Sequence, residues 1–454
     1  MMKKRWAVVV PMVLFALYMF IFLLTEFTVN VKSAIVLGQG SVTAIYSVGI
    51  VSTSLGYISF YLSRKLFKSE LVRKLLVGIF AVGYLGFTLC FMFTASAALF
   101  TTSALLALLL FGYIGGFVHY TISLFLFGKS YSGKVIGIAI SAATLLQFTV
   151  QNLLVTDIAL LISLFLGSIG IVYLAVRPVK DWMFENPLPY SKEPSVTVRG
   201  LLLPILIVAA MSVCFGLSDG LVTQLHADGV INLASYERLL YALGVFIAGI
   251  VTDIRTRKLL PLCTLCMLVL TAAMALFIGA GNTATNGLYV SVMYLFSGFY
   301  VMYLTITFIG AAPMTGKPDL WAGMGRIVRG VCIGVMAYIA NPLFENIGQQ
   351  GIAIASICIA IVALVLFVAS GTLNLRMEKQ EQPRDRIKGF ALEYKLTPRE
   401  TDVFSMLVDD DTPNKDIAAA LCVSVRVVER YITAIYEKTG TRTRVGLVKL
   451  YYNR

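Results

Sequence analysis

The chain has 454 residues, of which 58% are hydrophobic and 13% charged, and its mean hydropathy is +0.84. Soluble domains carry about 25% charged residues, so this composition shows that most of the chain cannot be a water-soluble domain. Residues 376 to 454 hold 15 Lys and Arg and 12 Asp and Glu, against 22 and 12 in all the residues before them. We therefore expect an all-α membrane part followed by a soluble tail.

Twelve apolar stretches are predicted to be transmembrane helices, each of which needs about 20 apolar residues. They are expected at residues 6 to 27, 42 to 62, 75 to 94, 99 to 123, 135 to 155 and 156 to 176, then at 201 to 225, 235 to 253, 259 to 279, 286 to 312, 320 to 341 and 351 to 373. The first is too long for the apolar core of a signal peptide and lacks an Ala-x-Ala end. This predicts a six-helix half over residues 1 to 176, a charged linker over 177 to 200 and a second half over 201 to 373.

Lysine and arginine in the short loops predict the orientation, because they favour the cytoplasmic side of a membrane. Eighteen of them lie in loops on the side of the N-terminus, and Lys32 alone lies in a loop on the opposite side. With an even number of spans both termini are then cytoplasmic. We expect a multi-pass membrane protein.

One loop carries a recognisable pattern. Gly249 is followed four residues later by Asp253 and then by the basic residues Arg255, Arg257 and Lys258. This loop resembles the signature loop of the major facilitator superfamily, which implies a 6+6 transporter-like fold, a close helix crossing at the glycine and a cytoplasmic Asp/Arg latch. The corresponding loop after Gly56 has the basic run but no acidic residue before it.

Polar side chains within predicted spans are costly in lipid and are therefore candidates for a ligand site. These residues are His119, Gln147, Gln151, Asp219, Arg326 and Arg329. The two glutamines are spaced i, i+4 and the two arginines i, i+3, so each pair shares a helix face, and the arginines favour an anionic ligand. The alternatives are that the arginines reach the interface or pair with Asp219, that the glutamines bond neighbouring helices, and that His119 is a structural hydrogen-bonding residue instead of a proton relay.

Catalytic and metal-binding patterns are not found in the sequence. The seven cysteines are scattered, so no disulfide framework is predicted. Cys263 and Cys266 have a zinc-like spacing, but they lie in an apolar stretch without a companion pair. There is no nucleophile-base arrangement or phosphate loop, and we expect neither an enzyme nor a cofactor.

The tail is predicted to contain four short helices after a charged tether over residues 374 to 395. Thr397 and Glu400 form a capping box that starts the first helix, and Thr412 and Pro413 open the second. Ser424 caps a third helix that ends at Gly440 and buries apolar residues at helical spacing, namely Val428, Ile432 and Ile435. A fourth helix follows over residues 441 to 452. The second and third helices, joined by a short turn, are typical of a helix-turn-helix.

The tail over residues 396 to 454 resembles the DNA-binding domain of LuxR-type bacterial regulators. The matching blocks are Leu396-Thr397-x-Arg399-Glu400, Asn414-Lys415-Asp416-Ile417-Ala418, Val423-Ser424 and Ile435-Tyr436-x-Lys438-x-Gly440 with Arg444. The resemblance implies DNA-binding roles for Lys415, Ser424, Arg426, Glu429, Arg430, Thr433, Lys438, Arg442 and Arg444, with Glu429, Arg430 and Thr433 facing bases. The chain departs from the family at Val427 to Tyr431, so its operator is not implied, and Glu429 either reads a base or weakens binding.

Together with the resemblance to LuxR-type bacterial regulators, these features predict a membrane-bound one-component transcription regulator of the bacterial inner membrane. Its membrane part would sense a small molecule within the lipid bilayer, and its tail would bind double-stranded promoter DNA, as a homodimer and together with RNA polymerase. The alternative is a major facilitator-type transporter with a regulatory DNA-binding tail.

Overall fold

The computed structural model describes residues 2–127, 129–154, 156–176, 198–227, 236–254, 259–277, 283–378, 383–409 and 412–452. The chain divides into two compact units. One comprises Met1–Leu188 with Val198–Leu366 and is called the membrane unit, and the other comprises Pro189–Thr197 with Phe367–Arg454 and is called the tail. Every regular element in the described ranges is a helix, which confirms the predicted all-α class. Nearly all of the predicted linker lies outside the described residues.

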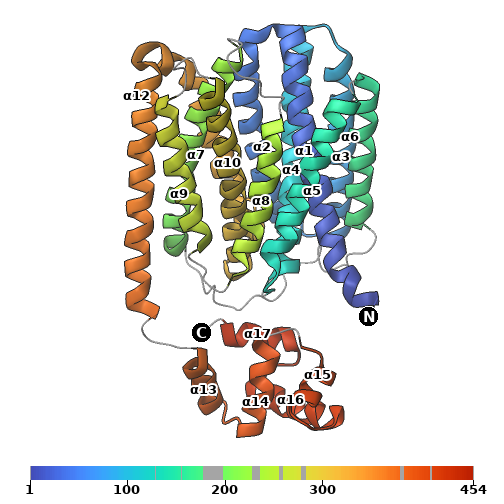
Figure 1. Cartoon of the computed structure of the whole chain (residues 1–454). Coiled ribbons are helices and arrows are strands. Elements are labelled where there is room, and N and C mark those ends of the chain that lie inside the picture. Colours follow the sequence, from blue (N-terminus) through green and yellow to red (C-terminus); the bar gives the residue numbers. More distant parts are fainter. Residues whose placement is uncertain are drawn as a thin grey trace. The chain divides into compact units, whose positions relative to one another are not determined.

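The first six helices lie where the apolar stretches predict them, and most are longer. They are α1 (Met2–Leu37), α2 (Val42–Leu66), α3 (Glu70–Phe93), α4 (Ala97–Leu126), α5 (Ser132–Leu153) and α6 (Asp157–Val176). The long helices run side by side as a bundle (Figure 1). α1 continues ten residues beyond its predicted end at residue 27, so Glu26 lies inside a helix and not at its end.

The second set contains α7 (Val198–Ala227), α8 (Leu239–Thr252), α9 (Leu259–Met274), α10 (Thr283–Ala311), α11 (Pro318–Trp321) and α12 (Met324–Glu378). α12 covers the last two predicted spans, and its backbone breaks at Gly348, where φ is 65° and ψ is 178°. Among the described helices, ten are long and apolar enough to cross a membrane. The two predicted spans outside these ten are residues 235 to 253, where α8 has only 14 residues, and residues 320 to 341.

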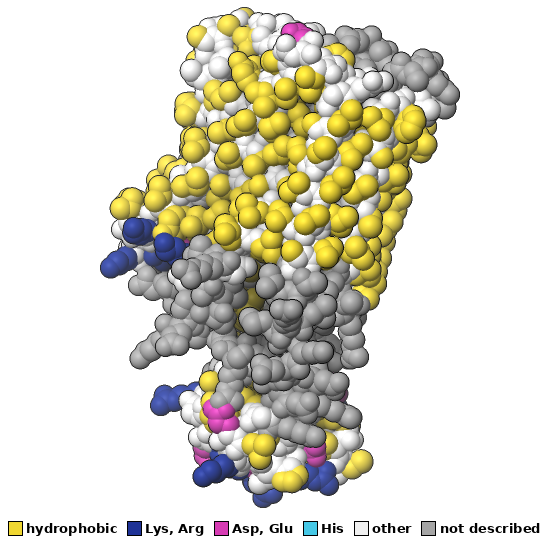
Figure 2. All heavy atoms as spheres, turned by 90° about the vertical axis from the view of Figure 1, so that its left-hand side faces the viewer, with side chains coloured by type: hydrophobic (Ala, Val, Ile, Leu, Met, Phe, Trp, Pro, Cys, Tyr) yellow, Lys and Arg dark blue, Asp and Glu magenta, His cyan; other side chains and the backbone are white. Residues whose placement is uncertain are grey.

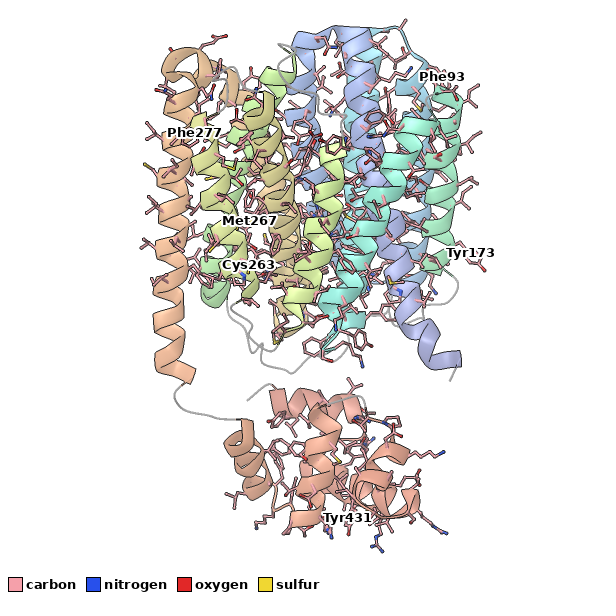
Figure 3. The ribbon with its side chains drawn as sticks, viewed as in Figure 1. Phe93, Tyr173, Cys263, Met267, Phe277 and Tyr431 are labelled. Atoms are coloured by element: carbon pink, nitrogen blue, oxygen red, sulfur yellow. The ribbon has the colours of Figure 1, made fainter. Side chains whose placement is uncertain are left out.

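The surface of the membrane unit is apolar, as expected for helices that face lipid. Large hydrophobic side chains such as Val82 and Ile79 are 70% and 63% exposed. Figure 2 shows hydrophobic side chains over most of one face of this unit. Phe93 and Tyr173 project away from the bundle (Figure 3). Polar side chains are instead turned inward, where many hydroxyls bond the backbone of their own helix, as Thr28 does with the Leu24 carbonyl at 2.7 Å.

Glycines allow two close helix crossings. A Cβ placed on Gly249 of α8 would lie 2.8 Å from the Gly133 carbonyl oxygen, and 3.0 Å from the Cα of Gly137 on α5. A Cβ on Gly56 of α2 would overlap the backbone of α4 near Gly112. The close crossing predicted at Gly249 is therefore present, and the matching glycine of the first set serves the same purpose although its loop fits the family pattern poorly.

The tail has five helices: α13 (Pro383–Glu393), α14 (Pro398–Asp409), α15 (Asn414–Ala420), α16 (Val425–Thr439) and α17 (Arg444–Tyr452). The last four were predicted. α13 was not, because it lies in the segment expected to be a tether. Its Phe390 stacks on Phe404 of α14 with ring centroids 4.4 Å apart, and it meets the edge of Tyr451 of α17 at 5.7 Å. The folded tail therefore begins earlier than residue 396.

Candidate functional site

The tail presents one polar face on its third predicted helix, α16. That helix buries Val428, Ile432 and Ile435 in the tail core, as their spacing predicted, and it ends at Gly440, whose φ of 67° is a left-handed cap. The opposite face exposes four side chains that were predicted to contact DNA, Arg426, Glu429, Arg430 and Thr433. Tyr431 lies beside them on the same helix (Figure 3), and the Arg430 guanidinium lies 5.9 Å from its ring centroid.

Two more predicted contacts flank this face. Lys415 on α15 and Arg442 after α16 are both exposed. Ser424 occupies the N-cap position of α16, but its side chain makes no capping hydrogen bond. From Ser424 onward the chain has seven basic and two acidic residues. This surface therefore combines exposed positive charge with a helix that can enter a groove.

The membrane unit contains a cavity of about 250 Å³ among α1, α2, α5, α7, α8, α10 and α12. Four of the six predicted ligand-site residues line it: Gln147, Asp219, Arg326 and Arg329. They come from three helices that are distant in the sequence. His119 and Gln151 are not among the lining residues.

The two α12 arginines that line the cavity are incompletely satisfied. The Nε atoms of Arg326 and Arg329 are buried and have no hydrogen-bond partner, and neither guanidinium forms an ion pair within the described residues. Arg326 donates only to the Met19 sulfur at 3.3 Å, and Arg329 lies 6.0 Å from the ring centroid of Phe215. The predicted alternative of an Arg–Asp219 ion pair is absent from this part of the structure. A buried guanidinium that has no carboxylate within ion-pairing distance is unfavourable, so this arrangement suits a site that receives an anion.

The remaining two candidates have local partners. His119 Nδ1 lies 2.9 Å from the Gly115 carbonyl oxygen, and that contact requires a proton on Nδ1 because a carbonyl only accepts. The Tyr57 hydroxyl lies 3.3 Å from the same nitrogen. Gln151 accepts a hydrogen bond from the amide of Gln147 one turn away. These contacts fit the predicted alternative of structural roles, while the Nε2 of His119 is buried without a partner among the described residues. The roles of both residues stay predictions.

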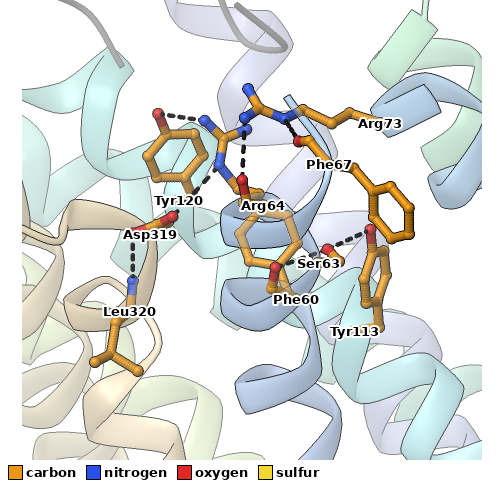
Figure 4. Close-up of polar contacts among 9 residues, drawn as sticks. All are labelled: Phe60, Ser63, Arg64, Phe67, Arg73, Tyr113, Tyr120, Asp319 and Leu320. Carbon is orange, nitrogen blue, oxygen red and sulfur yellow. Dashed lines mark hydrogen bonds and ion pairs between the residues drawn. The ribbon is translucent and has the colours of Figure 1, made fainter. Parts of the chain in front are cut away.

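Polar contacts also join the two helix sets at the end of the bundle where α2 ends. The Arg64 Nε lies 3.5 Å from the Asp319 carboxylate of α11, and its guanidinium stacks on Tyr120 at 4.5 Å (Figure 4). Arg73 donates to the carbonyls of Phe67 and Arg64 at 2.7 and 3.1 Å. The loop after α2 has no acidic residue at the position of the pattern. Its Arg64 instead contacts the Asp319 carboxylate of α11, in the second set of helices.

The second-half loop uses its aspartate. Both carboxylate oxygens of Asp253 accept backbone N–H groups at the start of α5, from Gly133 and Lys134, each at 2.8 Å. Burial raises the pKa of Asp253, and these two bonds oppose the rise. Asp253 thus caps α5, which is the favourable position for a negative charge on a helix. The basic residues 255 to 258 of this loop lie outside the described residues.

Comparison with known proteins assigns the tail. Residues 394–451 match the family described as bacterial regulatory proteins, luxR family. This segment is a LuxR-type helix-turn-helix domain. The chain is 44% identical over 70 residues to a probable transcriptional regulator ycf29 of Porphyra purpurea, and 48% identical over 54 residues to the response regulator Rre1 of Synechocystis sp.. The matches cover 15% and 12% of this chain, and 32% and 23% of those proteins.

The membrane unit resembles a transporter structure. The crystal structure of the human organic anion transporter MFSD10 (TETRAN) superimposes with a TM-score of 0.58 at 15% sequence identity, over 80% of this chain and 99% of that one. At this identity the likeness concerns the fold alone. It agrees with the predicted resemblance to the major facilitator superfamily.

Two predicted DNA contacts of the LuxR-type domain have partners within the domain. Lys438 Nζ lies 2.6 Å from Glu400, whose carboxylate also accepts the Thr397 N–H at 2.7 Å, so the predicted capping box is formed and tied to α16. Burial raises the pKa of Glu400, but the bonds from Lys438 and Thr397 outweigh it and the pKa is lowered. Arg444 donates to the Leu407 and Thr412 carbonyls at distances of 2.7 to 3.2 Å. Whether these two side chains also contact phosphate stays a prediction.

Some cavity residues were missed by the sequence analysis. Glu26 of α1, Tyr46 of α2 and Arg238 before α8 all line the cavity. Glu26 and Arg238 both lie within four residues of the end of a predicted span, where a charged side chain is common, and were therefore not chosen. A carboxylate in an otherwise apolar stretch was the available signal. No group of three or more His, Cys, Asp or Glu side chains that could hold a metal is found among the described residues.

Proposed function

We propose that this protein is a transcription regulator of the bacterial inner membrane, with both termini in the cytoplasm and twelve spans in a 6+6 arrangement. Its LuxR-type domain binds double-stranded promoter DNA as a homodimer and engages RNA polymerase. Its membrane unit binds a small molecule in the charged cavity and controls the domain. The observation that carries the proposal is that one chain contains both a LuxR-type domain and a polar cavity inside an apolar bundle.

Two features support the membrane topology. Ten described helices meet the length and apolarity required of a span, and the two remaining predicted spans correspond to α8 and the first part of α12. The loop charges favour cytoplasmic termini. Arg238 precedes α8 on the side opposite to the termini, which adds one charge to Lys32 on that side and leaves the bias strong.

The connection between the units supports coupling. The part of α12 before the break at Gly348 carries Arg326 and Arg329 on the cavity wall, and the part after the break ends at Glu378. Four residues of chain then separate Glu378 from Pro383, where α13 begins, and α13 packs into the tail core through Phe390. A ligand that shifts α12 toward one conformation would act on the tail through this short chain connection, and a preference for one conformation is what a ligand can supply.

The test is a footprint of the full-length protein on its promoters, found by chromatin profiling, combined with the transcriptome of a deletion strain. The proposal expects specific footprints that disappear with Arg430→Ala, and genes near them whose transcription changes in the deletion strain. Promoters bound equally by the variant would contradict it.

A second candidate function is transport, which the MFSD10-like fold and the cavity favour. In that case the LuxR-type domain would be a regulatory appendage. Uptake or counterflow in proteoliposomes containing a variant that ends before α13 distinguishes the two. Saturable uptake would establish a transporter or a transporter-sensor, and its absence together with ligand binding would leave a sensor.

A further inference from the structure

The cavity of the membrane unit carries an excess of positive charge. Its described lining includes three guanidiniums, on Arg326, Arg329 and Arg238, and two carboxylates, on Glu26 and Asp219. Both carboxylates lie in the electrostatic field of Arg329, but neither forms an ion pair with it in the described part of the structure. The two α12 arginines keep unused N–H groups. Among the described lining residues, the positive charges therefore exceed the negative ones by one.

The geometry of the donors points to a flat anionic group. A guanidinium presents N–H groups in a fixed planar fork that matches the two oxygens of a carboxylate. Arg326 and Arg329 lie three residues apart on one helix, so both forks face the same region of the cavity. Arg326 is 8% exposed and its only described hydrogen bond is to a methionine sulfur, which is a weak acceptor.

The walls around these donors are aromatic. Phe22, Phe27, Tyr46, Phe215, Tyr241 and Tyr294 line the cavity, in contrast to its few charged groups. Pockets for drug-sized ligands are about 300 to 1,000 Å³, and this cavity is smaller, at about 250 Å³. Aromatic faces pack best against flat apolar groups. A hydrated inorganic ion would leave these walls without a partner.

We propose that the cavity binds a small organic monoanion that has one carboxylate and a flat, preferably aromatic, apolar body. The carboxylate lies between Arg326 and Arg329, and the ring packs near Phe215. This names the ligand class of the sensor site and so rests on the proposed function. A cation is disfavoured by the three guanidiniums, and a zwitterion would leave the excess positive charge uncompensated.

The experiment measures binding of simple probes to the full-length protein in lipid nanodiscs, by calorimetry and by the shift in its unfolding temperature. The probes are benzoate and phenylacetate, with benzamide as the neutral analogue of the same shape, phenylalanine as the zwitterion and inorganic phosphate as the anion without an apolar body. We expect the two carboxylates to bind and to raise the unfolding temperature, and the other three to bind at least about tenfold more weakly, the change expected from losing one charge-assisted hydrogen bond.

Variants then locate the site. Arg326→Gln and Arg329→Gln should each weaken carboxylate binding at least about tenfold, and Arg329→Lys should recover part of it, because lysine keeps the charge and loses the fork. Lys65→Gln removes an exposed charge at the end of α2 and is the matched control, with unchanged binding. If an arginine variant does not fold, binding of the probe series to the wild-type protein still tests the proposed ligand class.

Several results would overturn the proposal: equal binding of benzamide, equal binding of phosphate, tighter binding of phenylalanine than of phenylacetate, or no binding of either carboxylate. Failure of the regulator proposal looks different. If the carboxylates bind but promoter footprints and transcription never respond to them, the proposed ligand class is supported and the proposed control of the DNA-binding domain by the ligand is contradicted. If transcription responds to a compound that is not an anion, the ligand class fails and the regulator stands.

Discussion

Charged side chains are used differently in the two units of this protein. In the LuxR-type domain Lys438, Glu400 and Arg444 are engaged with the fold at distances of 2.6 to 3.2 Å, and they tie helices together. In the membrane cavity Arg326 and Arg329 are held among aromatic walls with donors that have no described partner. A charged side chain that is hydrogen-bonded within the fold contributes to stability, whereas a buried charge without a partner lowers it. We therefore interpret the unpartnered arginines of the cavity as binding residues. The difference separates structural charges from binding charges.

Outside the cavity, the largest effect of a mutation is expected at Arg430, which is exposed on α16 and is predicted to bind DNA. Arg430→Ala should reduce specific DNA affinity about 5- to 150-fold, since a base contact of this kind is worth about 1 to 3 kcal/mol. The stability of the domain should not change, because the buried face of α16 is untouched. Footprinting and chemical denaturation of a fragment over residues 383 to 454 measure the two. If the variant lost stability as well as DNA affinity, Arg430 would be a structural residue and not a DNA contact.

Arg444 is expected to behave in the opposite way. Arg444→Ala removes its bonds to the Leu407 and Thr412 carbonyls and should cost about 1.5 to 3 kcal/mol of unfolding free energy, the usual contribution of hydrogen bonds from a charged group. Denaturation of the same fragment measures it, and exposed Arg442→Ala is the matched control with little change. An unchanged midpoint in Arg444→Ala, with weakened DNA binding, would show that this arginine contacts phosphate instead.

Glu400 should make the stability of the domain depend on pH. Its pKa in the folded state lies below the ordinary value of about 4.5, so ionised Glu400 stabilises the fold above that pH and the contribution is lost as the pH falls through the lowered pKa. Glu400→Gln should flatten this part of the stability curve and cost about 1 kcal/mol at neutral pH, the typical contribution of a helix cap. A pH series of urea unfolding on the fragment, with Asp402→Asn as the control, tests it. Parallel curves for variant and parent would contradict the assigned role.

The smallest effect is expected at Glu429, an exposed carboxylate on the DNA-facing side of α16. Glu429→Lys should raise general DNA affinity and steepen its dependence on salt by about one unit in the log–log slope, because one more phosphate contact releases one more counterion. Titrations at several salt concentrations measure both. Weaker specific binding by the variant would show that Glu429 reads a base.

Much of the fold was predictable because it is local. Apolar runs and helical spacing predicted most helices of both units, and the capping box at Thr397 and Glu400 is formed as expected. α13 was not predictable, since its composition is that of a charged tether and its place in the fold depends on Phe390 meeting Phe404 and Tyr451. Contacts between residues distant in the sequence are not encoded in a local pattern.

The same limit applies to the sites. The cost of polar groups in lipid was sufficient to choose Gln147, Asp219, Arg326 and Arg329, which the fold brings to one cavity. It also chose His119, which does not line that cavity, and it missed Glu26, which lies next to the predicted helix end. The pairing of Arg64 with Asp319 joins two helix sets, and only the arrangement of those sets makes it visible.

The central claim is that occupancy of the cavity controls DNA binding by the same chain. Its most direct measurement is promoter occupancy by the full-length protein in cells, with and without the carboxylate that binds, in the wild type, Arg326→Ala and Arg329→Ala, with membrane fractions blotted to equalise protein. We predict that occupancy changes with ligand in the wild type, and that both variants stay at the ligand-free level while fragments over residues 383 to 454 still bind DNA. A wild-type response in both variants would contradict the account and make these arginines structural.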